Sequence, residues 1–332
     1  MQFDTQEIPM ATGPAVSKSV GLPARQPLPS RLLPGQRLPG RRLGQQARRS
    51  LWGVFFALPA LILVVALLVL PALQALYYSF TSWDGTDAQW IGLQNYANGL
   101  FANPDFRRIL LNNAIIIASV PIEVAVALAV SYLLMMRRRS RPFFRAVFFL
   151  PVALSWVVIG LTFGYLFSSR GAVNTVLDDI GLSALSSDWL AGDWTSLAAL
   201  ILAFSWSYLG INVVLLSTGL STVDPSVIEA ARLDGAGGLG MLRLVILPQI
   251  RRYVELALIV TMSAAITQIF GLIYTMTAGG PGRSTTTLEY ALYQTSFAQG
   301  NFGQGSALGI VLFVLSLAVT ALRIRSGVAS RD

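Results

Sequence analysis

Side chains capable of covalent or acid–base chemistry are scarce in this sequence of 332 residues. It contains no Cys and no His, which excludes thiol nucleophiles, disulfides, thiolate or imidazole metal sites and His-based acid–base catalysis. The only Lys, Lys18, lies in a polar N-terminal tail, which disfavours Schiff-base chemistry. The scattered acids suggest neither a nucleophile–base pair nor a metal-ligand set. We therefore expect that the chain is not an enzyme, with no catalytic residues, no bound cofactor and no metal site.

The elements that must position the other polar residues are strongly apolar. Apolar residues make up 54% of the chain and charged residues only 12%, whereas a soluble domain carries roughly 25% charged residues. A helix needs about 20 residues to cross a bilayer. Six stretches meet this requirement: 54–80, 109–136, 146–167, 197–219, 254–276 and 306–322. Because backbone polar groups in hydrocarbon must be satisfied within the segment, we predict an all-α membrane protein with six transmembrane helices.

The distribution of basic residues predicts the orientation of these helices. With the N-terminal tail placed in the cytoplasm, twenty of the 24 basic residues fall on the cytoplasmic side. Only Arg107, Arg108, Arg170 and Arg283 fall outside. The positive-inside rule then places both termini in the cytoplasm of a multi-pass protein of the cell (inner, cytoplasmic) membrane. This topology accounts for the net charge of +8, so we expect membrane lipid and no nucleic acid as a partner.

Two domains of unequal size are expected. Residues 1–50 are rich in Pro, Gly, Gln and Arg and lack apolar periodicity, which predicts a disordered basic cytoplasmic tail. Residues 51–332 form the six-helix transmembrane domain.

The segment 224–248, between the fourth and fifth spans, has strong helix boundary signals. Asp224 is a good N-cap for a helix with Pro225 at its first position, and Gly235 suits the positive φ that follows a helix end. A second short helix is predicted from about Gly238 to Val245, before Pro248. The segment is therefore expected to form a compact helix-turn-helix on the cytoplasmic side.

This segment resembles the EAA loop of ABC-importer permeases, in which EAA is followed by Gly and then by Leu-Pro at fixed spacing. The matching or adjacent residues are Glu229, Ala230, Ala231, Asp234, Gly235 and Ala236, followed by Val245 and Leu247-Pro248. The resemblance implies a coupling helix that docks on a cytoplasmic ATPase subunit. Residues 235–240 also match G-x-G-x-x-G, but a dinucleotide site needs a preceding strand, and no Walker A motif occurs anywhere in the chain.

Further motifs resemble carbohydrate-type permeases of the maltose and glycerol-phosphate kind. They are residues 90–96 (WIGLQNY), 270–274 (FGLIY) and 277–281 (TAGGP), followed by Thr285, Thr286, Thr287, Leu288, Tyr293 and Phe297. Gly271 replaces an acid that is usual in that family. The resemblance implies a permease subunit of an ATP-driven, binding-protein-dependent importer of a sugar or a related polyol or oligosaccharide. The implied partners are a second homologous permease, two cytoplasmic ATP-binding subunits that hold ATP and Mg, and an extracytoplasmic solute-binding protein.

Polar side chains inside two of the expected spans are candidates for the substrate pathway. They are Trp206, Ser207, Tyr208 and Asn212 in the fourth span and Thr267 and Gln268 in the fifth. For each Ser or Thr the competing interpretation is a hydrogen bond within its own helix or to a neighbouring helix. Tyr208, Asn212 and Gln268 are costlier to place in lipid and are the stronger candidates, and the ring of Tyr208 or Trp206 offers a face for a sugar.

Two acids lie within or beside the spans. Glu123, in the second span, either makes a structural hydrogen bond in the bundle, which we favour, or forms a proton relay. The relay would belong to the alternative function, a stand-alone secondary transporter or channel using Glu123. Glu255 lies close to Arg251 and Arg252 and is expected to form an interfacial ion pair.

Overall fold

The computed structural model describes residues 56–136 and 141–328, and the regular secondary structure of this part of the chain is helical, apart from one isolated bridge between Thr81 and Trp90. The prediction for residues 1–50 lies outside the described residues. The chain divides after Leu61, and all packing described below lies within Ile62–Asp332. The helices are α2 (Leu70–Tyr78), α3 (Pro104–Met136), α4 (Arg141–Phe149), α5 (Trp156–Leu166), α6 (Ala172–Asp179), α7 (Asp193–Leu220), α8 (Pro225–Leu233), α9 (Gly238–Gly240), α10 (Leu247–Gln249), α11 (Arg251–Thr267), α12 (Phe270–Met276), α13 (Leu288–Tyr293) and α14 (Phe302–Val328).

Four of the six predicted spans are continuous helices. They correspond to Phe56–Tyr78, which contains a π-helical turn before α2, and to α3, α7 and α14. Each is long and apolar enough to cross a membrane, and two bent pairs of helices bring the number to six if each pair is one span. Pro121 lies inside α3 without ending it. The prediction of an all-α membrane protein is confirmed.

The third predicted span, 146–167, is not one continuous helix. Its two halves, Ala146–Ala153 and Trp156–Leu166, are bent by 107°. The 3₁₀ turn Leu150–Ala153 contains Pro151, and Leu154 and Ser155 are extended. The Ser155 hydroxyl then accepts a hydrogen bond from the Val158 amide at 3.4 Å and caps α5. The predicted span is therefore broken at Pro151, a residue type that interrupts regular helix hydrogen bonding.

The fifth predicted span, 254–276, is also broken. Helices α11 and α12 meet at an angle of 51°, and Gln268 and Ile269 lie between them. No Pro or Gly occupies this break, so the local sequence contains no helix breaker that would predict it. Side chains from other elements hold the backbone there, as described below.

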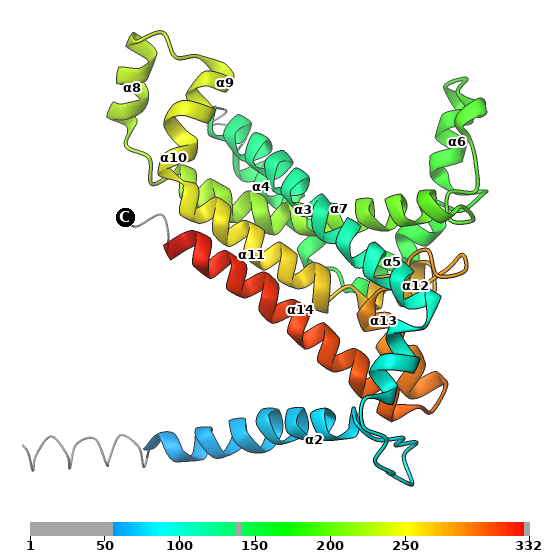
Figure 1. The fold of residues 1–332 in the computed structure, drawn as a ribbon. Coiled ribbons are helices and arrows are strands. Elements are labelled where there is room, and N and C mark those ends of the chain that lie inside the picture. The colour runs from blue at the N-terminus through cyan, green and yellow to red at the C-terminus, as the bar shows by residue number, and fades with distance from the viewer. Residues whose placement is uncertain (1–55, 137–140, 329–332) are drawn as a thin grey trace, which may run out of the picture. The chain divides into compact units, whose positions relative to one another are not determined.

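Helices α3, α7 and α11 form the centre of the packing. Helix α3 packs along α7 and α11, and α11 also contacts α14. Figure 1 shows α8 and α9 beyond one end of α11 and α13 near the other end. Small residues allow α5 and α12 to approach closely: a Cβ on Gly160 would overlap the Thr275 hydroxyl, and one on Gly271 would lie 3.0 Å from Trp156 Cβ. Gly271, which replaces the acid of the carbohydrate-type motif, therefore lets Trp156 pack tightly against α12.

Candidate functional site

The segment between α7 and α11 forms the predicted helix-turn-helix. Helix α8 begins with Pro225, and the Asp224 carboxylate accepts a hydrogen bond from the Ser226 amide at 2.9 Å and from its hydroxyl at 2.8 Å. These bonds lower the pKa of Asp224 from its ordinary value. The charged form of Asp224 is therefore the capping form, and the cap fixes where α8 starts.

Gly235 ends α8 in the geometry that its sequence position predicts. Its φ is +81°. The Ala236 amide donates to the Ala231 carbonyl at 2.8 Å, and the Gly235 amide donates to the Arg232 carbonyl at 3.1 Å. This is the hydrogen-bond pair of a Schellman motif, which requires a left-handed residue at the position of Gly235.

The second helical segment runs from Gly238 to Gln249 and is longer than predicted. It contains α9, a π-helical turn at Met241–Ile246, and α10. The Tyr132 hydroxyl donates to the Gly238 carbonyl at 3.2 Å, which ties the start of this segment to the end of α3. Helix α11 follows at Arg251, where the predicted ion pair forms between Arg251 Nε and Glu255 Oε1 at 2.8 Å.

The helix-turn-helix presents exposed side chains of mixed character. Glu229, Ala230, Asp234 and Gly235 are exposed, whereas Ala231 and Ala236 are half-buried and pack against the core. Three leucines stand out from the same segment: Leu233 is 89% exposed, and Leu239 and Leu244 are each 76% exposed. Apolar side chains gathered on a polar loop are typical of a surface that another protein covers.

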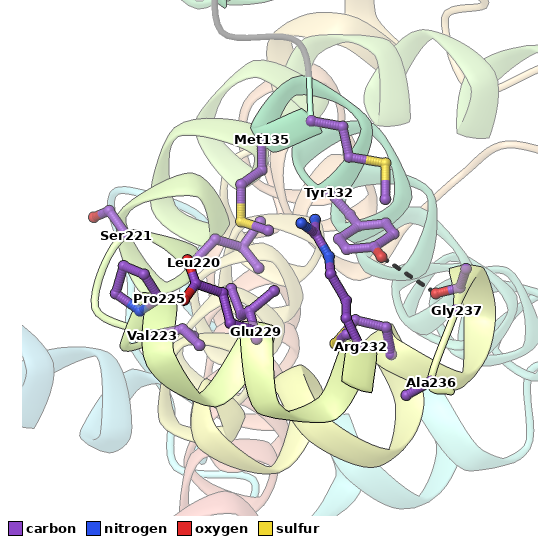
Figure 2. Close-up of a pocket in the computed structure, with 14 residues that line it drawn as sticks. Tyr132, Met135, Leu220, Ser221, Val223, Pro225, Glu229, Arg232, Ala236 and Gly237 are labelled. Atoms are coloured by element: carbon purple, nitrogen blue, oxygen red, sulfur yellow. Dashed lines mark hydrogen bonds between the residues drawn. The ribbon is translucent and has the colours of Figure 1, made fainter. Parts of the chain in front are cut away.

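A pocket of about 670 Å³ lies between α8 and the ends of α3 and α7. Figure 2 shows the Arg232 side chain extending from α8 into this space beside Tyr132, with Met135 nearby. Glu229 also lines the pocket, so its carboxylate lies on the edge between the pocket and the exposed face of α8.

The strongest pathway candidates make hydrogen bonds between helices. The Tyr208 hydroxyl donates to Gln268 Oε1 at 3.0 Å, which joins α7 to the break between α11 and α12. Asn212 Nδ2 lies 3.0 Å from Glu123 Oε1 and 2.9 Å from Thr261 Oγ1. The Asn212 cluster links α3, α7 and α11 through buried polar groups, whereas Gln268 is exposed.

The other pathway candidates have less specific surroundings. The Ser207 hydroxyl donates to the Ala203 carbonyl at 2.9 Å, and the Thr267 hydroxyl donates to the Ser263 carbonyl at 3.0 Å. Both bonds lie within the residue's own helix, as the competing interpretation states. Trp206 is 37% exposed, and its ring centroid lies 5.3 Å from that of Phe163. The structure therefore does not bring these three side chains to the Tyr208 and Asn212 clusters.

Glu289 is a polar residue of this region that the sequence reasoning missed. Its Oε2 accepts a hydrogen bond from the Phe270 amide at 2.9 Å, so a side chain of α13 caps the start of α12 at the break. Burial raises the pKa of the Glu289 carboxyl to about 7, although the amides of Phe270 and Ile269 act in the lowering direction. Its only sequence signal is an acid two residues after Thr287, which caps α13.

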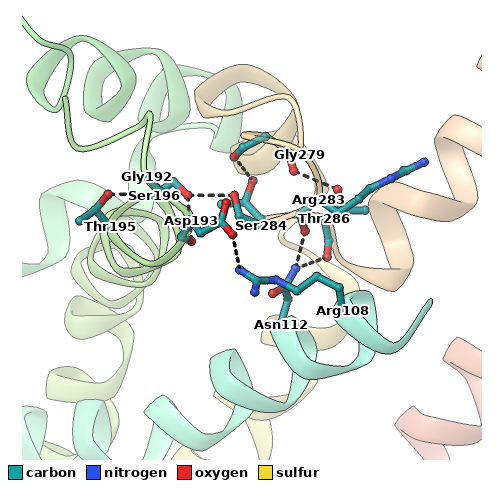
Figure 3. A network of polar contacts seen from close by, with 12 residues as sticks. Arg108, Asn112, Gly192, Asp193, Thr195, Ser196, Gly279, Arg283, Ser284 and Thr286 are labelled. Carbon is teal, nitrogen blue, oxygen red and sulfur yellow. Dashed lines mark hydrogen bonds and ion pairs between the residues drawn. The ribbon is translucent and has the colours of Figure 1, made fainter. Parts of the chain in front are cut away.

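A polar network covers the end of the helices opposite α8. Asn112 Nδ2 donates to the carbonyls of Arg283 and Thr286 at 2.8 and 2.9 Å, and the Ser196 and Ser284 hydroxyls lie 3.0 Å apart. Arg108 lies 3.9 Å from the Asp193 carboxylate. Figure 3 shows how these residues tie the starts of α3 and α7 to the loop that contains the TAGGP motif. These contacts therefore hold the loop that follows the TAGGP motif against α3 and α7.

The first outer motif is also held by side-chain hydrogen bonds. Asn95 Nδ2 donates to the carbonyls of Ser79 and Thr81 at 2.9 and 2.8 Å, and the Tyr96 hydroxyl donates to Ser79 Oγ at 2.8 Å. These bonds fix the end of α2. Within the described residues, no group of three or more acids lies close enough together to hold a metal ion.

The chain has apolar helices able to cross a membrane, with polar clusters buried between them, and an exposed helix-turn-helix between two spans. This combination is that of a multi-pass membrane permease. The chain belongs to the family described as binding-protein-dependent transport system inner membrane component, which it matches over residues 97–330. It is therefore the permease component of a binding-protein-dependent importer. The alternative of a stand-alone secondary transporter or channel does not fit this family.

Relatives match nearly the whole transmembrane part of the chain. The sulfoquinovosyl glycerol transport system permease protein SmoG of Agrobacterium fabrum is 32% identical over 280 residues, which cover 83% of this chain and 90% of that protein. The multiple sugar-binding transport system permease protein MsmF of Streptococcus mutans is 28% identical over 82% of this chain and 94% of that protein.

A solved structure has the same fold. One chain of a bacterial alginate ABC transporter, in complex with an alginate pentasaccharide-bound periplasmic protein, matches with a TM-score of 0.69 at 20% identity. The match covers 85% of this chain and 96% of that chain.

Proposed function

We propose that this chain is a permease subunit of an ATP-driven importer of a sugar or a related polyol or oligosaccharide. The observation that carries the proposal is the helix-turn-helix at Asp224–Gln249, which exposes Glu229, Ala230 and three leucines between two spans. The carbohydrate class is supported by the relatives, whose names refer to multiple sugars and to sulfoquinovosyl glycerol. The sugar-type motifs of the outer loops support it further.

The helix-turn-helix is the proposed contact with a cytoplasmic ATP-binding subunit. Glu229, Ala230, Ala231, Asp234, Gly235 and Ala236 form the coupling element. Glu229 offers a carboxylate for a basic or hydroxyl group, and Ala230 allows close approach because it is small and exposed. Two such ATP-binding subunits would bind ATP and Mg, and one of them would dock on this chain while the other docks on a second homologous permease.

The orientation follows from charge. Arg232, Arg243, Arg251 and Arg252 belong to the helix-turn-helix and the start of α11, whereas Arg108 and Arg283 belong to the network at the opposite end. The positive-inside rule then places the helix-turn-helix and both termini in the cytoplasm. The network end faces outward, where a solute-binding protein would deliver the substrate.

The substrate pathway is proposed to pass the break between α11 and α12. A discontinuous helix exposes polar groups at membrane depth, which is where transporters commonly bind their substrates. Gln268 lies at this break and Tyr208 bonds to it, so these two residues are the strongest candidates. Glu123 and Asn212 are assigned a structural role between α3 and α7.

Uptake measurements test the proposed function. Cells that lack the importer would be given this chain together with a candidate binding protein, second permease and ATPase from the same genome. We expect ATP-dependent uptake of at least one of ¹⁴C-labelled glucose, maltose, trehalose and raffinose, with loss of uptake when the binding protein is omitted. Uptake driven by this chain alone, and abolished by a protonophore at constant ATP, would contradict the proposal.

A further inference from the structure

A row of aromatic rings connects the end of α12 with the outer loop after α2. We define the outer aromatic row as Tyr274, Tyr293, Phe297, Phe302 and Trp83. The centroid distances between successive rings are 5.7, 5.7, 5.9 and 5.2 Å. The rings come from three separate parts of the chain, so the fold and not the local sequence assembles the row.

One end of the row reaches the break in the fifth span. The Phe270 ring lies 5.6 Å from the Tyr274 ring and 5.0 Å from the Tyr293 ring. The Phe270 amide donates to Glu289, and Gln268, which is bonded to Tyr208, lies two residues earlier in the chain. The outer aromatic row therefore begins beside the residues proposed to bind the substrate.

The other end of the row lies on the outer side. Trp83 and Phe302 belong to the segments that adjoin the ends of α2 and α14 opposite the helix-turn-helix, and the Gly303 amide donates to the Trp83 carbonyl at 2.8 Å. The Trp83 ring also stacks on Tyr78 at 3.9 Å, which fixes its plane. The row therefore spans from the outer loop to the break.

The rings of the row are not core residues. Tyr274 is 48% exposed and Phe297 is 68% exposed, while Tyr293, Phe302 and Trp83 are half-buried. Rings that only fill a core would lose most of their accessible surface. These side chains contact their neighbours in the row, and Tyr274 and Phe297 keep the largest accessible surface that another molecule can cover.

We propose that the outer aromatic row is a stacking track for sugar rings, which accepts the carbohydrate on the outer side and passes it to the break at Gln268. This inference rests on the proposed carbohydrate importer. The C–H face of a pyranose packs on an aromatic ring. Several similar, weak stacking positions allow a sugar to advance without being trapped at one of them.

The amount of sugar transported per ATP hydrolysed distinguishes a stacking track from a role in coupling. In proteoliposomes containing the complete importer, we would use whichever of the four labelled sugars the wild type transports best. Phe297→Leu keeps an apolar side chain but removes the ring face, so we expect the sugar moved per ATP to fall about three- to tenfold. ATP hydrolysis stimulated by the loaded binding protein should not change, because Phe297 follows α13, which lies near the end of α11 opposite the coupling element (Figure 1).

Two control variants separate stacking from general packing. Phe297→Tyr keeps the ring and should transport like the wild type. Phe313→Leu removes a ring that is 59% exposed on α14 but outside the row, and it should also have no effect.

The outcomes distinguish the track from its alternatives. If Phe297→Leu and Phe313→Leu behave alike, the Phe297 ring contributes nothing beyond an exposed ring outside the row, and the track is refuted. A parallel fall in transport and ATP hydrolysis would show a structural or subunit-contact role and would also refute it. If the wild-type importer transports none of the four sugars, the proposed function fails and the track fails with it.

Discussion

Asn212 donates a hydrogen bond from Nδ2 to Glu123 Oε1 over 3.0 Å, between two side chains that are 1% and 4% exposed. The two residues are 89 positions apart in the sequence, and the bond joins α7 to α3. Thr261 extends the contact to α11, since it also bonds to Asn212. A single buried polar cluster therefore fastens the three central helices.

Replacing Glu123 separates a structural role from proton transfer. Glu123→Gln keeps an oxygen that accepts from Asn212, so we expect near-normal uptake. Glu123→Ala leaves the Asn212 amide without this partner and should destabilise the protein by about 1–3 kcal/mol. Thermal unfolding in detergent and uptake in cells measure the two effects. Loss of uptake by the stable Gln variant would instead indicate a proton relay.

Gln268 and Tyr208 provide the second prediction. If they bind substrate, Gln268→Ala or Tyr208→Phe should lower transport by the equivalent of about 1–3 kcal/mol, because a hydrogen-bond partner is lost. Binding of the ATP-binding subunits, measured by co-purification, should stay normal. Normal transport by both variants would indicate that the substrate site lies in the second permease.

We expect the free energy of unfolding to depend on pH because of Glu289. Its pKa is raised from 4.5 to about 7 in the folded protein, so the folded state holds the proton more tightly than the unfolded chain. The contribution of Glu289 to stability is therefore fully present below pH 4.5 and is lost as the pH rises to about 7.

Thermal unfolding of the wild type and of Glu289→Gln checks this dependence. The Gln variant stays neutral and keeps an acceptor for the Phe270 amide. We expect the wild type to lose stability relative to the variant between pH 4.5 and about pH 7. A constant difference in Tm over this range would show that the carboxyl does not titrate there.

The sequence predicted the continuous spans, the ion pair of Glu255 and the boundaries of α8, because apolar length, Asp224 and Gly235 are local signals. The two broken spans were harder to predict from the sequence. Pro151 marked the first break, but the second depends on Tyr208 and Glu289, which reach Gln268 and Phe270 from other helices. Contacts over such separations are set by packing and have no local signature.

The orientation can be tested with single cysteines, because the chain has none of its own. Ser187 and Gln299 are exposed on the side proposed to face outward, and Leu239 is exposed on the helix-turn-helix. An impermeant thiol reagent applied to intact cells should label cysteines at the first two positions and not at Leu239. Labelling only of the cysteine at position 239 would show that the chain has the opposite orientation.

The coupling element gives the sharpest prediction, because two glycines form a matched pair. A Cβ would meet no atom within 4 Å at either Gly235 or Gly237, but φ is +81° at Gly235 and −128° at Gly237. A β-branched residue resists only the positive φ. Gly235→Val should therefore disrupt the Schellman turn, whereas Gly237→Val should not.

Docking can be tested separately from the turn. Ala231 is half-buried against the core, so a large residue there would distort the segment itself, but Ala230 is exposed. Ala230→Trp should keep the fold and obstruct the close approach of an ATP-binding subunit. We expect both Gly235→Val and Ala230→Trp to insert in the membrane normally but to lose co-purification with the ATP-binding subunit or substrate-stimulated ATP hydrolysis. Gly237→Val should retain both. Wild-type uptake and ATP turnover in Gly235→Val and Ala230→Trp would refute the coupling role of this segment, because the turn and its exposed face would then be dispensable for transport.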